Sequence, residues 1–199
     1  MDPFLVAVVA IALLFDFTNG FHHAANAVAT SISTRAIPPN IALAGAAVLN
    51  VLGALVSTHV ATTLASGIVD PTAVTPVVML GGLVGAIVWN LLTWWWALPS
   101  SSSHCLIGGI VGAVYATAGP ALVRWDGILH KVLIPTVAAP LIGFAVGVLL
   151  MVVIYWACRN AHPGPAMRGF RISQTISASF MAFSHGSNDA QKSVGIIAA

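Results

Sequence analysis

Long apolar runs separated by short polar interruptions dominate this chain of 199 residues. Residues 4–15 are apolar throughout, and three longer runs, at residues 41–69, 72–98 and 132–158, contain no Asp, Glu, Lys or Arg. A helix needs about 20 mostly apolar residues to cross the hydrocarbon core of a bilayer. The pattern therefore predicts an all-α integral membrane protein with several spanning helices.

The first run leads into the polar sequence FDFTNGFHHAANAVAT. Residues 4–15 and 24–37 are each too short to span alone, so we expect one span whose centre, at residues 16–23, is unwound or kinked. Gly20 supplies a flexible backbone there, and the side chain of Asn19 can hydrogen-bond groups that a broken helix leaves open. Unsatisfied polar groups are costly in lipid, so these residues must face a cavity, an ion or another helix.

A partial echo of this sequence, FSHGSNDAQKSVG, begins at Phe183. We interpret the two copies as one broken-helix element used twice. The loop at residues 159–171 carries three Arg, and this basic excess favours the cytoplasmic side. If the segments before that loop all cross, the second copy enters the membrane from the face opposite to the first. That arrangement is an inverted repeat with discontinuous helices, as in many transporters.

This interpretation divides the chain into three parts. Residues 1–158 form a first membrane repeat of about five segments, residues 159–171 a basic cytoplasmic loop, and residues 172–199 the start of an incomplete second repeat. The segment at residues 99–119 opens with Pro and a run of Ser, which is a start signal for a helix. This segment either crosses the membrane or belongs to a re-entrant hairpin, and both alternatives remain open.

The composition supports a membrane protein and excludes several functions. Hydrophobic residues make up 58% of the chain and charged residues only 6%, whereas soluble domains carry about 25% charged residues. The net charge of +2 gives no reason to expect a nucleic-acid partner. No nucleophile–base pair, nucleotide-binding loop or paired carboxylate is present in the sequence, so neither an enzyme nor a cofactor is expected.

Polar residues outside the repeated sequence offer further candidate chemistry. The N–H groups and Ser hydroxyls at residues 100–103 suit an anion, although a run of Ser also simply caps a helix. Several histidines raise the hypothesis of a His-lined divalent-metal permease, but they lack the spacing of metal ligands. Asn50 and His59 are interpreted as hydrogen-bond partners between helices.

The two motif copies and the serine run together resemble a known family. NGFHHAANAVATSISTRAI and FSHGSNDAQKSVGII are similar to the paired signatures of the inorganic phosphate transporter (PiT) family, and LPSSSSHCLIGG resembles its Pro-Ser-Ser/Thr-Ser/Thr-His motif. The resemblance implies a symporter of the cell (inner) membrane that moves inorganic phosphate, with Na⁺ or H⁺ as the coupling ion. The implied partners are phosphate and the lipid bilayer, and no nucleic acid is implied. Whether the protein forms a homodimer stays open at this point.

The resemblance also implies site residues, carried over position by position. Gly20 and Thr30 belong to the first signature, and Ser184 belongs to the second. Lys192 either counters the phosphate charge or neutralises Asp189, three residues earlier on a helix face. The implied phosphate contacts are Ser101, Ser102, Ser103, His104, Gly186, Ser187, Gln191 and Lys192. The implied cation-coupling residues are Asp16, Asn19, His22, His23, Asn26, Asn188 and Asp189, with Asn26, Asn188 and Asp189 as ligands of Na⁺.

This chain departs from the family pattern in two places. His23 stands where the family usually has Asp, and imidazole cannot supply the negative charge that binds Na⁺. Cation coupling through the first motif then depends on Asp16. The family also continues beyond the position of Ala199, so we expect a fragment, a truncated product or a degenerate homologue. The alternative to a phosphate symporter is therefore a half-transporter that needs a second chain.

Overall fold

The structure is a computed structural model that describes residues 3–56 and 67–198, without the side chains of residues 3, 24 and 190–198. These residues are helical almost throughout, and the isolated β-bridge among them joins Val69 to Val123. The predicted all-α fold is therefore confirmed. The elements are α1 (Pro3–Ser33), α2 (Pro39–Val56), η1 (Pro71–Ala73), α4 (Pro76–Trp95), α5 (Ser102–Ala118), η2 (Pro120–Leu122), α6 (Trp125–Ile128), η3 (Leu129–Leu133), α7 (Ile134–Cys158) and α8 (Pro163–Ala198).

The two helices that carry the signature motifs are unbroken, contrary to the sequence prediction. α1 continues as one helix of 31 residues through residues 16–23, and α8 continues as one helix of 36 residues through the second motif. The prediction of discontinuous helices is therefore wrong for both motifs. Some of their polar side chains find partners without unwinding of the helix: Thr18 Oγ1, for example, donates a 2.8 Å hydrogen bond to the carbonyl oxygen of Phe15, one turn earlier.

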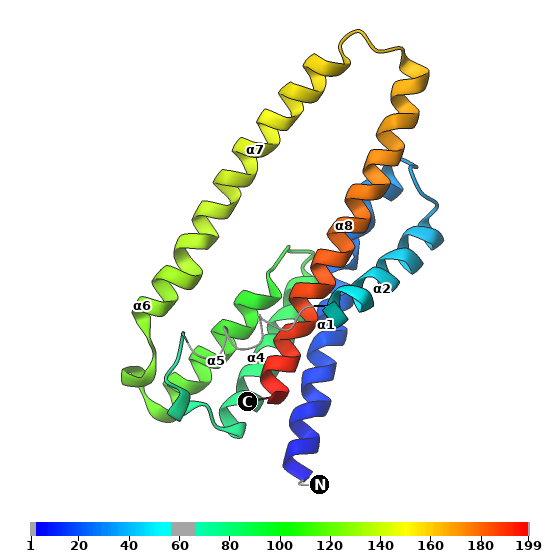
Figure 1. Cartoon of the computed structure of the whole chain (residues 1–199). Helices are drawn as coiled ribbons and strands as arrows, with labels where there is room; N and C mark the ends of the chain where they lie inside the picture. The colour runs from blue at the N-terminus through cyan, green and yellow to red at the C-terminus, as the bar shows by residue number, and fades with distance from the viewer. Residues whose placement is uncertain (1–2, 57–66, 199) are drawn as a thin grey trace.

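α1 and α8 pack against each other and run in opposite directions (Figure 1). Asn19, near the middle of α1, contacts Asp189, whereas Thr34, just beyond its end, contacts Gln174. Residue numbers therefore rise along α1 as they fall along α8. The second motif approaches the first from the opposite direction, as the prediction of an inverted repeat requires.

Glycines bring α8 close to α2. A Cβ atom on Gly186 would overlap the backbone of Asn50, and a Cβ atom on Gly53 would overlap the carbonyl oxygen of Phe183. Small residues at helix crossings allow this close approach between backbones. The crossing places the second motif against α2 as well as α1.

α4 and α5 form the apolar centre of the bundle together with the first half of α1. Phe15, Leu83 and Leu106, one from each helix, are buried in a single hydrophobic cluster. Gly82 and Gly109 lie where α4 and α5 cross, and a Cβ atom on either glycine would overlap the facing helix. This packing fixes the start of α5 against α4 and α1.

An ion pair joins the loop before α4 to the loop after α5. Arg124 Nη2 lies 3.3 Å from Asp70 Oδ2, and Asp70 Oδ1 accepts hydrogen bonds from the hydroxyl and the backbone N–H of Thr72. The hydrogen bonds from Thr72, followed by the Arg124 guanidinium, hold the pKa of Asp70 below its ordinary value of 3.8. We call Asp70, Thr72 and Arg124 the loop clasp.

Within residues 3–56 and 67–198, four helices are long and apolar enough to cross a membrane, so the chain is a multi-pass membrane protein. They are Phe4–Ser33, Pro39–Val56, Pro76–Trp95 and Trp125–Cys158. α5 is apolar but has only 17 residues, so the crossing and re-entrant alternatives for this segment both remain open. α7 stands apart from the other helices in Figure 1, and none of its residues is buried.

The start of α8 differs from the sequence prediction, and the end of the span predicted at residues 41–69 cannot be compared with the structure. α8 begins at Pro163, so only residues 159–162 of the basic loop predicted at 159–171 connect helices. Pro163 and Pro165 lie in the first turn of α8, where a missing N–H breaks no helical hydrogen bond. The span predicted at residues 41–69 begins as α2, but residues 57–66, including His59, lie outside the described residues.

Candidate functional site

The two signature motifs meet where α1 crosses α8. Asn19 is buried at 3% exposure, and its Nδ2 donates a 2.9 Å hydrogen bond to Asp189 Oδ2. The same carboxylate oxygen lies 3.1 Å from His185 Nε2, one turn earlier on α8, although these two atoms are not aligned for a hydrogen bond. Asp189 thus has an amide donor from the first motif and an imidazole from the second.

α2 joins this cluster through Asn50. His185 Nδ1 lies 2.8 Å from Asn50 Oδ1, while Asn50 Nδ2 donates to the carbonyl oxygen of Ala46. The prediction that Asn50 is a hydrogen-bond partner between helices is therefore confirmed. The bond to Ala46 orients the Asn50 amide so that its oxygen faces the second motif.

Three imidazoles form a row beside this contact. The ring centres of His22 and His23 are 4.9 Å apart, and those of His23 and His185 are 6.0 Å apart. His23 Nδ1 lies 3.3 Å from Asn26 Nδ2, on the next turn of α1. The ring of His23 therefore lies between that of His22 on α1 and that of His185 on α8.

A cavity of about 240 Å³ connects the first motif to the start of the serine motif. Ala97 has a φ of +53°, and the N–H of Leu98 donates to the carbonyl oxygen of Thr93, which turns the chain sharply after α4. The turn brings Ser100 Oγ to 3.0 Å from Thr93 Oγ1. The cavity is lined by His22, His23, Asn26, Thr93, Trp94, Ala97, Leu98, Pro99 and Ser100.

The serine motif begins α5, as the sequence predicted. Ser101 is the N-cap, and its hydroxyl accepts from the backbone N–H of His104 at 3.4 Å. Ser102 is buried, whereas Ser103 is half-buried. His104 Nε2 lies 2.7 Å from Thr136 Oγ1 and so links this turn to α7.

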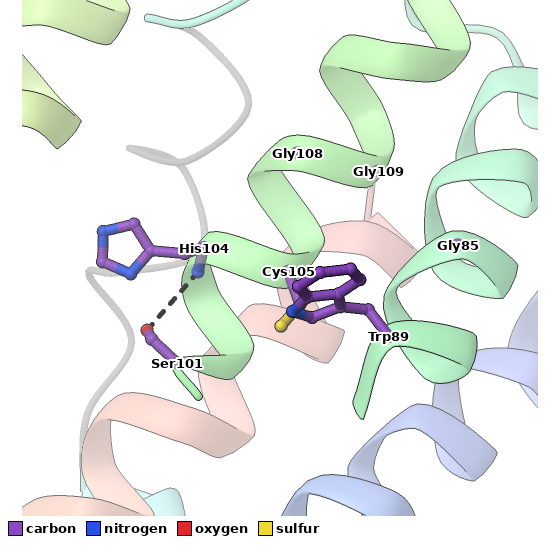
Figure 2. A pocket seen from close by; sticks show the side chains of 7 residues that line it. All are labelled: Gly85, Trp89, Ser101, His104, Cys105, Gly108 and Gly109. Carbon is purple, nitrogen blue, oxygen red and sulfur yellow. Dashed lines mark hydrogen bonds between the residues drawn. The ribbon is translucent and has the colours of Figure 1, made fainter. Parts of the chain in front are cut away.

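A second cavity, of about 400 Å³, opens beside this helix start (Figure 2). Trp89 of α4 lies beside Cys105, and the ring of His104 projects from the other side of the same turn. The cavity combines an aromatic wall with the N-terminal end of a helix, which is a favourable place for an anion. Its lining residues are Gly85, Trp89, Ser101, His104, Cys105, Gly108 and Gly109.

The remaining predicted residues are spread over α1 and α8. Gly186 is buried against α2, and Ser187 Oγ donates to the carbonyl oxygen of Ser184. Asn188 is exposed and also donates to Ser184, so its neighbours differ from those of Asp189. Asp16 is half-buried on α1, and the side chains of Gln191 and Lys192 lie outside the described residues. No group of three or more His, Cys, Asp or Glu able to hold a metal ion occurs among the described residues.

Sequence reasoning missed two polar residues on α4, Asn90 and Thr93. They are 1% and 4% exposed within a helix that was interpreted only as an apolar span. Two polar residues three positions apart share one face of a helix, and this spacing was the available signal. Thr93 reaches Ser100, so this face of α4 belongs to the site.

The fold and these contacts define a helical multi-pass membrane protein with polar side chains gathered between its spans. The sequence profile of the Phosphate transporter family matches residues 19–168. The chain therefore belongs to the phosphate transporter family, and the predicted resemblance is confirmed. Its named relatives are transporters and not enzymes, as the sequence predicted.

Several curated relatives carry matching names. A "Probable low-affinity inorganic phosphate transporter" of Mycobacterium bovis is 50% identical over 193 residues, covering 97% of this chain and 46% of that protein. One of the same name from Streptomyces halstedii is 51% identical over 184 residues, covering 92% of this chain and 85% of that protein. The "Low-affinity inorganic phosphate transporter PitA" of Escherichia coli is 34% identical over 228 residues, covering 97% and 44%.

The fold likewise matches a solved structure, described as "The sodium-dependent phosphate transporter". The TM-score is 0.76 at 21% sequence identity, covering 98% of this chain and 66% of that one. This likeness shows a shared fold. The chain spans about half the length of most of the curated relatives it matches.

Proposed function

We propose that this chain forms part of a secondary active transporter that moves inorganic phosphate across the cell (inner) membrane together with Na⁺ or H⁺. The observation that carries the proposal is the contact between Asn19 and Asp189, which joins the two signature motifs across antiparallel helices. The cavity that extends from His22 to Ser100 supports a connection between these motifs and the serine start. The names of the relatives support phosphate as the substrate.

The start of α5 supplies donors suited to an oxyanion. Its first turn concentrates backbone N–H groups and the positive end of the helix dipole beside the cavity that Ser101 and His104 line. Phosphate, which carries several acceptor oxygens, would take hydrogen bonds from this turn. We propose Ser101, Ser102, Ser103 and His104 as phosphate contacts from α5, and Gly186, Ser187, Gln191 and Lys192 as contacts from α8.

Asp189 is the acid that we propose for the coupling ion. Its side chain is 17% exposed, and it lies between Asn19 and His185. A partly buried carboxylate attracts Na⁺ through its hard oxygen atoms and can equally accept a proton. Because His23 replaces an acid on α1, the negative charge of the two motifs comes from Asp16 and Asp189. Asn26 and Asn188 complete the proposed Na⁺ ligands.

Uptake of radiolabelled phosphate into proteoliposomes tests the proposal. The chain is expected to accumulate phosphate under an inward Na⁺ or H⁺ gradient, and the gradient that drives uptake identifies the coupling ion. Phosphate uptake that is independent of both gradients would contradict the proposed symport. Absence of phosphate uptake and binding by the reconstituted chain would remove the proposal altogether.

A pair of variants ties the result to the site. Asp189→Asn should abolish dependence on the gradient, because it removes the charge that the coupling ion neutralises. Asp126→Asn is the matched control, since the Asp126 side chain is 90% exposed and lies outside both motifs. Equal loss in the two variants would show that the effect does not come from the α1–α8 contact.

A half-transporter that needs a second copy or a second chain is the alternative. The observation that favours it is α7, an apolar helix of 25 residues with none of them buried. Crosslinking in native membranes followed by uptake measurements separates the alternatives. Monomers that still transport phosphate would rule out the half-transporter hypothesis. Transport confined to crosslinked homodimers or complexes would favour it. The third hypothesis, a divalent-metal permease, gains no support from the described residues.

A further inference from the structure

Asn90 is a buried amide whose two polar ends both lack a hydrogen-bond partner. The residue is 1% exposed in the second half of α4, and neither Nδ2 nor Oδ1 has a hydrogen-bond partner. Taking an amide out of water without a compensating hydrogen bond is costly. Buried polar groups in proteins are therefore nearly always satisfied by the protein, by water or by a ligand.

The contacts between α4 and α5 give the level of Asn90 along the bundle. Gly85 packs on Gly109, whereas Thr93, two turns later, reaches Ser100, so the two helices are antiparallel. Asn90 lies between Gly85 and Thr93. It is therefore level with the first turn of α5, which carries the buried Ser102.

α1 adds a polar residue at a similar level. The rings of Phe21 on α1 and Trp94 on α4 meet edge to face with their centres 5.4 Å apart, and Phe15 shares a buried cluster with Ile87, so α1 and α4 run in the same direction. The part of α1 opposite Asn90 therefore lies between Phe15 and Phe21. It includes Asn19, whose Oδ1 is also buried without a partner.

Asn90 lies on α4 between a residue that lines one cavity of the site and a residue that lines the other. Trp89, its neighbour on α4, lines the larger cavity together with Ser101, and Thr93 lines the smaller one together with Ser100. The unsatisfied amide thus stands where the first motif, α4 and the serine start converge. A substrate that enters either cavity therefore meets a residue within one turn of Asn90.

We propose that Asn90 is a specificity-determining ligand of the phosphate site, an inference that rests on the function proposed above. When substrate entry exposes the amide, Nδ2 donates to a deprotonated phosphate oxygen and Oδ1 accepts from a protonated one. Hydrogen phosphate and dihydrogen phosphate carry both kinds of oxygen. Sulfate carries only acceptors at neutral pH, so it would leave Oδ1 buried without a donor, which a binding site penalises strongly.

Competition between phosphate and sulfate tests this assignment in the full chain. Binding of radiolabelled phosphate to the purified protein is measured in the presence of increasing sulfate, for the wild type and for Asn90→Leu. The variant should bind phosphate about tenfold more weakly and should lose most of its preference over sulfate, because both hydrogen bonds are gone. Its thermal midpoint should be equal to or higher than that of the wild type, since an unsatisfied amide has been replaced by an apolar side chain of similar size.

Two further variants make the result specific. Asn90→Ser keeps a donor and an acceptor on a shorter side chain and should restore part of the preference for phosphate. Ser31→Ala removes another hydroxyl that is fully buried without a partner, but this one lines a separate cavity between α1, α2 and α8. The preference of Ser31→Ala should equal that of the wild type.

The outcomes separate this inference from the function on which it rests. A wild type that prefers phosphate, with an Asn90→Leu variant of unchanged preference, overturns the inference and leaves the proposed function standing. A destabilised Asn90→Leu variant with unchanged preference also overturns it, because the amide then acts in folding only. A wild type that binds neither anion overturns both.

Discussion

Two carboxylates in this chain are held by partners far away in the sequence, but they differ in their surroundings. Asp189 contacts Asn19 between α1 and α8 with a side chain 17% exposed, whereas Asp70 of the loop clasp is 33% exposed beside a half-exposed Arg124. Polar interactions strengthen as water is excluded and weaken where ions screen them. The comparison shows that the distance between two paired groups does not by itself indicate how much the pair contributes to stability. The burial of the two groups must also be known.

The largest effect is expected from Asn19→Asp, which places a second carboxylate against Asp189. The hydrogen-bond donor is replaced by a like charge in a partly buried site, at a cost of about 3 kcal/mol or more. Thermal unfolding of the purified chain in detergent should therefore show a clearly lower midpoint. Asn19→Leu removes the donor without adding charge and should cost less, about 1–3 kcal/mol. Equal midpoints for Asn19→Asp and the wild type would contradict the contact.

A smaller loss is expected from Gly186→Ala, which tests whether the polar contact depends on close helix packing. The added methyl group would overlap the backbone of Asn50 and force α8 away from α2, at a cost of about 1–3 kcal/mol. Gly143→Ala on α7 is the matched control, because a Cβ atom there meets open space and alanine favours a helix. Denaturation in detergent should destabilise the first variant and leave the second unchanged or more stable.

The smallest effect is expected at the loop clasp, and it should depend on pH. Because folding lowers the pKa of Asp70, its contribution to stability is present above the ordinary value of 3.8 and disappears as the pH falls through the lowered value. The difference in thermal midpoint between the wild type and Asp70→Asn should therefore be small at neutral pH and should shrink as the pH falls below 3.8. A difference that grows on acidification would contradict this assignment, and added salt should reduce the difference at neutral pH.

Sequence reasoning found the parts of the site that are marked by unusual residues in apolar surroundings. Asn19 and Asp189 stand out because polar groups in a membrane span need partners, and the structure brings them together. Asn50 was identified by the same reasoning. The helix start at Ser101 follows from local N-cap chemistry, which needs no knowledge of the fold.

The sequence predictions were wrong or incomplete where the local structure depends on contacts between helices that are far apart in the sequence. The break predicted near Gly20 followed from treating residues 4–15 and 24–37 as two short apolar runs joined by an unwound centre, but α1 stays helical and Asn19 finds a partner on α8. Asn90 gave only a weak signal, because its burial depends on how α4 meets α1 and α5. The roles assigned to Asn26, Asn188 and the residues of the serine motif remain predictions.

The bond between His104 and Thr136 connects α7 to the helix start that carries Ser101. Since no residue of α7 is buried, we expect this helix to adjust its tilt to the thickness of the surrounding lipid. Such tilting would pull on the first turn of α5 through the ring of His104. Thin and thick bilayers should therefore alter the shape of the serine turn, so that lipid composition becomes a variable in any measurement on this protein.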